Sequence, residues 1–396
     1  MRRTLAALSL TALAFAACDS SQTSNTVLDM TTSAPDLSVD TTADMTADTP
    51  DLVVTGDMVT PPTTPTEFSV VRIGTGAGGL TNDATAAFIE RRKIADGTLV
   101  GAALALPTAA AGTNKQLTLS GLATVEGQLS RSADGKYLLI AGYAANPGVN
   151  NISTSSSTMY NRVVGRIDAA GNINTATSTS AYNTQAVRGA TSTDGNAIWI
   201  SSDAGIGYTT LGSTAMPTSL NTLVSRAIDI FPGPNGRQLY VSSAGGGNLG
   251  VNTVGTGTPM TTATVTRLTG FTDTNSPSSV GYVAFDRDNN GTLDQLYVAD
   301  DRTVTGGGVQ RWKLNGTTWM LEGTISTGTG TGARYVTGFV SGNTVTVLAT
   351  TSELAAQPRV VALTDNGGTT AQVTSKTLAT AQNNTTYRGI ALAPLP

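Results

Sequence analysis

A repeated pattern of short strands and tight turns is the feature that most restricts the folds open to this chain. Residues Gln128 to Gly142 (QLSRSADGKYLLIAG) align with residues Arg188 to Ser202 (RGATSTDGNAIWISS). In each copy, two apolar runs joined by an Asp-Gly turn predict a β-hairpin. Looser copies begin near Arg226, Gly281 and Tyr335. The chain is therefore expected to use one β-unit several times.

The spacing of these copies distinguishes between two all-β architectures. Periods of roughly 40 to 50 residues with four strands per unit are typical of β-propellers, not of sandwiches. Six anchor positions mark the expected inner strands: Gly127, Gly189, Ala227, Gly281, Val336 and Gly389. We therefore predict an all-β, six-bladed β-propeller, with a seven-bladed ring as the alternative.

The two ends of the body each supply part of a blade. Tyr387 to Ala393 is half a copy, whereas Phe68 to Leu106 contains strands without a matching inner strand. Pairing between these two segments would close the ring without leaving exposed strand edges. We expect this closure, and almost no helix, in a propeller domain of residues 67–396.

The N-terminus predicts export. Arg2 and Arg3 precede an apolar run that is too short to span a membrane permanently, a pattern typical of signal peptides. The only cysteine of the chain, Cys18, ends the motif FAAC, which resembles the lipobox of bacterial lipoproteins. We expect residues 1–17 to be a lipoprotein signal peptide and Cys18 to carry the lipid. The alternative is an ordinary signal peptide cut after Ala17.

Residues 18–66 are expected to form a disordered tether. This segment is rich in Asp, Thr and Pro, contains no Lys or Arg, and has too few apolar residues to bury a core. It would hold the body away from a membrane. The expected location is the outer membrane or the cell surface, with the periplasmic face of the inner membrane as the alternative.

Composition excludes several kinds of chemistry. The chain contains no histidine, which rules out Ser-His-Asp and zinc-His mechanisms. A formal net charge of −4 makes nucleic acid an unsuitable partner. With its one cysteine in the predicted lipobox, the body cannot be held together by disulfides and needs a large core. It is expected to be monomeric.

One loop has the composition of a calcium site. The segment DRDNNGTLD matches the D-x-D-x-N-G-x-x-D pattern of short calcium loops in β-hairpins. Calcium prefers six to eight oxygen ligands, and a glycine permits the sharp turn between them. The alternative is a plain Asn-Gly hairpin with solvated acids. The expected ligands of a structural Ca²⁺ are Asp286, Asp288, Asn290, Thr292 (through its carbonyl) and Asp294.

A second group of polar residues is expected to share one face of the ring. In a propeller, the ends of the second strands and the starts of the inner strands lie on the same face, and the first hairpins lie on the other. The residues that these positions gather are Tyr143, Arg188, Asp203, Arg226, Asp300, Asp301, Arg302, Arg334, Tyr335, Glu353, Tyr387 and Arg388. They could bind a ligand at the central mouth. The alternative is that the arginines only bridge neighbouring blades.

The Asp-Gly hairpins followed by LLI or IWI resemble bacterial propellers of the lactonase-like and Tyr-Val-Thr-Asn repeat kind. Together with the lipobox, the tether, and the segments LYVADD (296–301) and YRGIALAP (387–394), they also resemble uncharacterised surface lipoproteins that carry a propeller. The resemblance implies a fold more strongly than a function, because propellers host unrelated functions.

We therefore expect a binding or surface-interaction module that is anchored to a membrane only through its lipid and recognises an unidentified protein or glycan. No catalytic residue is assigned. A calcium-dependent hydrolase of a lactone, glycoside or phosphate ester is the alternative, because such chemistry can use two carboxylates without histidine. A purely structural envelope protein is a third possibility.

Overall fold

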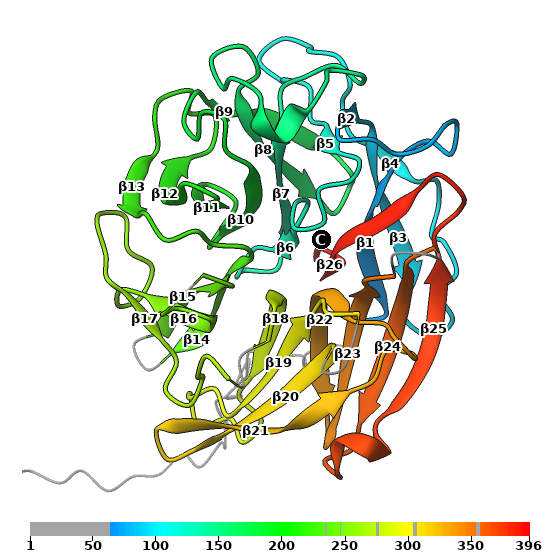
Figure 1. The fold of residues 1–396 in the computed structure, drawn as a ribbon, viewed down its shortest axis with the longest axis vertical. Coiled ribbons are helices and arrows are strands. Elements are labelled where there is room, and N and C mark those ends of the chain that lie inside the picture. The colour runs from blue at the N-terminus through cyan, green and yellow to red at the C-terminus, as the bar shows by residue number, and fades with distance from the viewer. Residues whose placement is uncertain (1–63, 234–235, 246, 275–276, 304–306, 354–356) are drawn as a thin grey trace, which may run out of the picture. The chain divides into compact units, whose positions relative to one another are not determined.

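The computed structural model describes residues 64–396, apart from 234–235, 246, 275–276, 304–306 and 354–356. Cys18, the predicted signal peptide and all but the last residues of the predicted tether lie outside the described residues. The described chain contains six antiparallel sheets of four strands each, arranged as the blades of a ring (Figure 1). The six-bladed prediction is confirmed.

In each blade the strands are given from the axis outward. Blade 1 contains β26 (Thr386–Leu392), β1 (Glu67–Ile73), β3 (Ala87–Lys93) and β4 (Leu104–Ala105). Blade 2 contains β6 (Leu129–Arg131), β7 (Tyr137–Tyr143), β8 (Arg162–Asp168) and β9 (Ile173–Thr179). Blade 3 contains β10 (Val187–Ser192), β11 (Ala197–Ser202), β12 (Gly205–Thr210) and β13 (Thr218–Asn221).

The other three blades follow in chain order. Blade 4 contains β14 (Ile228–Gly233), β15 (Gly236–Ser243), β16 (Gly250–Val254) and β17 (Val265–Arg267). Blade 5 contains β18 (Ser279–Phe285), β19 (Gln295–Asp300), β20 (Gly308–Asn315) and β21 (Thr318–Ile325). Blade 6 contains β22 (Ala333–Ser341), β23 (Thr344–Thr351), β24 (Arg359–Asp365) and β25 (Thr374–Thr380).

Short elements complete the described chain. The strands β2 (Ala84–Thr85) and β5 (Leu119–Ser120) pair with each other beside blade 2 (Figure 1). Helical residues within the described ranges are confined to two single turns, η1 (Ile152–Thr154) and η2 (Thr370–Gln372). The expectation of almost no helix is therefore confirmed for this part of the chain.

Blade 1 closes the ring with strands from both ends of the body. The inner strand β26 pairs antiparallel with β1, with Leu392 opposite Phe68 and Ala391 opposite Ser69. The inner strands then contact one another around the axis, from β26 to β6 and β10, and from β18 through β22 back to β26. The closure predicted from the half copy is confirmed.

Apolar side chains fill the spaces between blades. Trp199 of β11 is completely buried and packs against Ile228 and Leu239 of the next blade. Its indole N–H donates a hydrogen bond of 2.7 Å to the carbonyl of Pro259, so the buried polar atom is satisfied. In blade 5, the Trp312 ring stacks on Phe271 with the ring centroids 3.9 Å apart. These contacts supply the large core that a body without disulfides requires.

Crowding at the axis explains two of the repeat glycines. A Cβ atom added at Gly281 would lie 2.7 Å from the Cα of Tyr335 in the next inner strand. At Gly389, a Cβ atom would overlap the backbone of Gly127 to Leu129. These distances are well below a normal carbon contact, so only glycine lets these inner strands approach each other.

Candidate functional site

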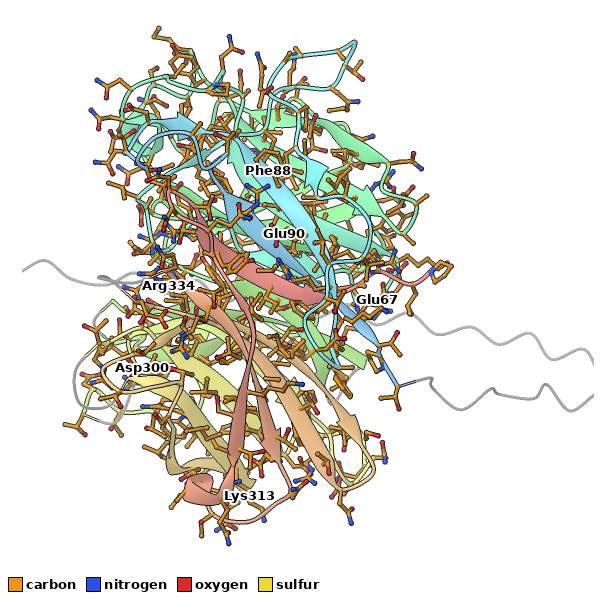
Figure 2. All side chains as sticks on the ribbon, turned by 90° about the vertical axis from the view of Figure 1, so that its right-hand side faces the viewer. Glu67, Phe88, Glu90, Asp300, Lys313 and Arg334 are labelled. Carbon is orange, nitrogen blue, oxygen red and sulfur yellow. The ribbon has the colours of Figure 1, made fainter. Side chains whose placement is uncertain are left out.

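The strand register separates the two faces of the ring. In blade 5, Ser279 at the start of β18 lies opposite Asp300 at the end of β19, whereas Phe285 and Gln295 flank the hairpin at the other end. Figure 2 shows Arg334 and Asp300 towards one side of the molecule and Glu67 towards the other. The starts of the inner strands therefore define one end of the axis.

We call this end of the axis the axial mouth. It is formed by residues that precede or begin inner strands, together with two acids that follow second strands, and its members are Glu126, Arg188, Asp203, Arg226, Asp301, Arg334, Tyr335 and Arg388. Each of the six blades, or the segment that leads into it, contributes at least one of these residues. Of the predicted residues, the structure thus brings together seven at the mouth.

Tyr335 lies at the centre of these interactions. Its side chain is buried, and its hydroxyl donates a hydrogen bond of 2.8 Å to the carbonyl of Val125. Burial raises the pKa of Tyr335, while the positive charges of Arg388, Arg188 and Arg226 act in the opposite direction. The phenol is therefore neutral and fixed at the point where three arginines converge.

Two of the arginines bridge neighbouring blades. Arg226 donates to the Ser278 hydroxyl at 3.2 Å and to the Ser279 carbonyl at 3.1 Å, where blade 5 begins. Arg388 donates to the Gly121 carbonyl at 3.1 Å, just before blade 2. Burial and the nearby charge of Arg334 lower the pKa of Arg388 to about 9. For these two arginines, the contacts match the alternative given in the sequence analysis, in which arginines bridge neighbouring blades.

The other two arginines differ in their partners. Arg188 forms an ion pair with Asp203 of the same blade. Arg334 is only 4% exposed, and its side chain donates no hydrogen bond to any residue that the structure describes. Burial lowers the pKa of Arg334, while the neighbouring Asp301, Tyr335 and Glu353 oppose this effect. A buried guanidinium without an acceptor is unusual, because buried polar groups are normally paired.

Glu126 is a mouth residue that the sequence analysis did not select. Its carboxylate is fully buried and accepts hydrogen bonds from the Tyr143 hydroxyl at 2.7 Å and the Ser120 N–H at 3.3 Å. Burial raises the pKa of Glu126 to about 7, although Tyr143 and two nearby arginines lower it. The repeat gave no signal for it, because the alignment places Gln128, and not Glu126, opposite Arg188.

Four predicted residues make their contacts away from the centre of the mouth. Asp300 is fully buried and pairs with Arg302 two residues along the chain. Glu353 accepts a hydrogen bond of 2.7 Å from Arg359 within blade 6. The Tyr387 hydroxyl lies 3.1 Å from the Glu90 carboxylate of β3, the third strand of blade 1. Tyr387 therefore points along its own blade, although its neighbour in sequence joins the mouth.

Beneath the mouth, the axis holds a cavity of about 230 Å³. At its upper end, the Gln128 side chain passes Gly189 of blade 3 and pairs with both backbone groups of Ile228 in blade 4, at 2.7 and 2.9 Å. Farther down, the cavity is lined by Arg131, Asp229 and Tyr282. Burial raises the pKa of Asp229 to about 7, and Arg131 opposes this shift. The axis thus has an arginine-rich mouth and a mixed lower chamber.

Comparison with known proteins found similar solved structures only at low sequence identity. No family model and no curated protein matches the sequence. Among solved structures, the chain is similar to TolB from Acinetobacter baumannii, with 12% identity over 83% of this chain and 67% of that chain and a TM-score of 0.48. It is also similar to a putative 6-phosphogluconolactonase from Bacteroides uniformis (12% identity, 80% and 82% covered, TM-score 0.41). A putative TolB from Agrobacterium tumefaciens gives 14% identity, 83% and 99% coverage and a TM-score of 0.42. TolB-like and lactonase-like propellers are therefore structural neighbours, and the similarity concerns the fold alone.

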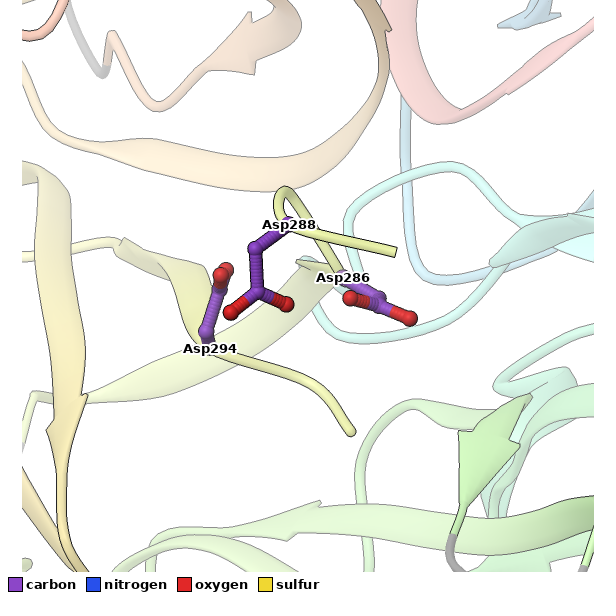
Figure 3. Close-up of side chains that lie close together, drawn as sticks. All are labelled: Asp286, Asp288 and Asp294. Carbon is purple, nitrogen blue, oxygen red and sulfur yellow. The ribbon is translucent and has the colours of Figure 1, made fainter. Parts of the chain in front are cut away.

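The predicted calcium loop forms the hairpin between β18 and β19. Carboxylate oxygens of Asp286, Asp288 and Asp294 lie within 4.8 Å of one another (Figure 3). Asp286 also accepts hydrogen bonds from the backbone N–H groups of Asn290 and Gly291, at 3.1 and 2.7 Å, which fold the loop around it. Among the described residues, none of the three acids forms an ion pair with Lys or Arg.

This donor set fits calcium, because three uncompensated carboxylates converge on one point and calcium prefers charged oxygen ligands. The predicted contributions of Asn290 and the Thr292 carbonyl remain predictions. The loop lies at the end of β18 opposite to Ser279, so it belongs to the other face of the ring. An ion held there would be separated from the mouth by the length of a strand.

Proposed function

We propose that this protein is a non-catalytic binding module of the cell envelope, which holds a polar ligand at the axial mouth. The observation that carries the proposal is the convergence of arginine, tyrosine and carboxylate side chains from the starts of the inner strands on one point. Convergent polar groups at the end of a rigid scaffold are typical of ligand sites. Tyr335 and Gln128 hold this scaffold in place through hydrogen bonds between different blades.

The N-terminal segment supports attachment to a membrane through lipid. The FAAC motif supplies Cys18 as the lipidated residue, and the acidic, Thr- and Pro-rich segment after it would act as a spacer. Within the described residues, no helix is long and apolar enough to cross a membrane. We propose that the body is carried outside the cytoplasm as a monomer, at the outer membrane or cell surface.

A calcium-dependent hydrolase is the second candidate. Glu126, whose burial raises its pKa to about 7, favours it, since a protonated carboxyl at neutral pH could act as a general acid. The position of the calcium loop weighs against it, because the loop lies on the other face from the mouth. Calcium there would stabilise the blade 5 hairpin and would not contact a ligand at the mouth.

A ligand panel tests the proposal. The purified protein is screened by thermal unfolding and then by calorimetry against amino acids, neutral sugars, dicarboxylates and inorganic phosphate. We expect at least one saturable ligand whose affinity falls at least tenfold in Arg188→Ala and changes at least tenfold, in either direction, in Asp301→Ala. The matched control is Arg267→Ala, which removes a cation from the outermost strand of blade 4. Mass spectrometry should recover the ligand unchanged.

Two results would contradict the proposal. Conversion of the ligand would favour the hydrolase. If the panel shows no ligand whose affinity depends on the mouth variants, and these variants change only the stability, the protein is a structural component of the envelope.

A further inference from the structure

The hydrogen-bond donors at the axial mouth exceed the acceptors around them. The Nε atoms of Arg188, Arg334 and Arg388 are buried and have no hydrogen-bond partner. Arg334 is the extreme case, because its terminal nitrogens also donate no hydrogen bond to the described residues. Arg334 therefore has hydrogen-bond donors that none of the described residues satisfies.

The charges at the mouth are also out of balance. Four guanidinium groups face Asp301 and Asp203, and Asp203 is already paired with Arg188. Glu353 also acts on Arg334, but it is paired with Arg359. Asp301 acts on Arg226 and Arg334 without forming an ion pair with either. The third acid of the mouth, Glu126, is partly protonated near neutral pH, because its pKa is about 7. The arginines also repel one another, since Arg188 lowers the pKa of Arg226.

We infer that the axial mouth binds a small oxyanion that carries at least two negative charges, with Arg334 as its principal ligand and Arg188, Arg226 and Arg388 around it. A guanidinium offers paired N–H groups that match the two oxygens of a carboxylate or phosphate. An anion would supply the acceptors that these donors lack and would reduce the repulsion between the cations. The inference rests on the proposed binding function and specifies the class of its ligand.

The geometry below the mouth limits the size of this ligand. Gln128 lines the cavity beneath the mouth, and both ends of its amide are held by Ile228, so its side chain is fixed at the entrance. Di- and tricarboxylates and inorganic phosphate have a suitable size and charge. Carboxylates and phosphate present similar pairs of oxygens to Arg334. Separate calorimetric titrations with each anion show which of them binds.

The experiment measures the binding of citrate, succinate and inorganic phosphate to the purified protein by calorimetry, at constant ionic strength set with sodium chloride. Glucose serves as the neutral ligand. We expect saturable binding of at least one oxyanion, weakened at least tenfold in Arg334→Gln and unchanged in Arg267→Gln. Without ligand, Arg334→Gln should unfold at a temperature no lower than the wild type, because it removes an unpaired buried cation. If Arg334 only stabilised the fold, Arg334→Gln would instead unfold at a lower temperature than the wild type.

Arg334→Lys provides a second variant that keeps the charge. It should bind the same oxyanion more weakly, since lysine lacks the planar fork of arginine. Equal oxyanion affinity in the wild type and Arg334→Gln, or in the wild type and Arg334→Lys, would overturn the inference. If a neutral ligand binds with dependence on Arg188 and Asp301 while the oxyanions do not bind, the inference is wrong and the proposed function stands. If neither class binds, both are wrong.

Discussion

Replacing Glu126 by glutamine should flatten the pH dependence of this protein's stability. Burial raises the pKa of Glu126 from 4.5 to about 7 in the folded state. Between these values the folded protein retains a proton that the unfolded chain has released, so the free energy of unfolding falls as the pH rises from 4.5 to 7. At about 1.4 kcal/mol per pKa unit, the ionisation of Glu126 costs about 3 kcal/mol above pH 7. Glutamine cannot ionise, and its amide oxygen can still accept the Tyr143 hydroxyl.

The assay is urea unfolding, followed by tryptophan fluorescence, at half-unit steps from pH 4.5 to 8. Chloride should be the only anion of the buffers, because oxyanions would bind at the mouth. Asp229 has a raised pKa in an overlapping range, so Glu126→Gln should remove part of the slope and Asp229→Asn another part. Only the slope of the free energy of unfolding against pH reports the ionisation of Glu126, so a shift of the Glu126→Gln curve that is equal at every pH has another cause. Parallel curves for Glu126→Gln and the wild type between pH 4.5 and 7 would refute the reasoning.

Three further outcomes can be checked by urea or thermal unfolding. Gly389→Ala should lower the free energy of unfolding by more than about 2 kcal/mol, because its Cβ overlaps a neighbouring backbone, whereas the exposed Gly79→Ala should change it by less than about 0.5 kcal/mol; equal effects would contradict the crowding argument. Asp365→Ala should cost about 2 kcal/mol, since Arg311 loses the carboxylate 2.7 Å away and the Tyr297 hydroxyl loses its acceptor, while Glu322 still pairs with Arg311; a loss below about 0.5 kcal/mol would contradict this. Millimolar calcium should raise the unfolding midpoint saturably in the wild type and not in Asp288→Ala; an unchanged wild-type midpoint would exclude the calcium site.

The fold was predictable because its unit is encoded locally. The Asp-Gly turns place Gly135 and Gly195 at φ of 81° and 82°, values that favour glycine and fix the first hairpins of blades 2 and 3. Once the hairpins are counted, the half copy at the C-terminus requires a partner at the other end of the body. That partner is β1, as the pairing of Phe68 with Leu392 shows.

The site was predictable only at the level of faces. Topology assigns a residue to one end of the ring, but the alternation of side chains along an inner strand decides which of two neighbours reaches the axis. Tyr387 and Arg388 show this, because one contacts β3 and the other joins the mouth. Glu126 was missed for a related reason: an acid beside a glycine usually lies in an exposed turn, and its burial against Tyr143 depends on long-range packing.

The composite blade also determines the order in which the molecule can be completed. Blades 2 to 6 each arise from one continuous stretch of chain, so their strands can pair soon after they emerge, whereas β1 needs residues from the far end of the sequence. Contacts between such distant residues form slowly. Until β26 arrives, the inner edge of β1 has free backbone groups that could pair with another chain. The last step of folding is therefore also the step that protects the chain from aggregation, and any delay in supplying its final residues prolongs the exposure.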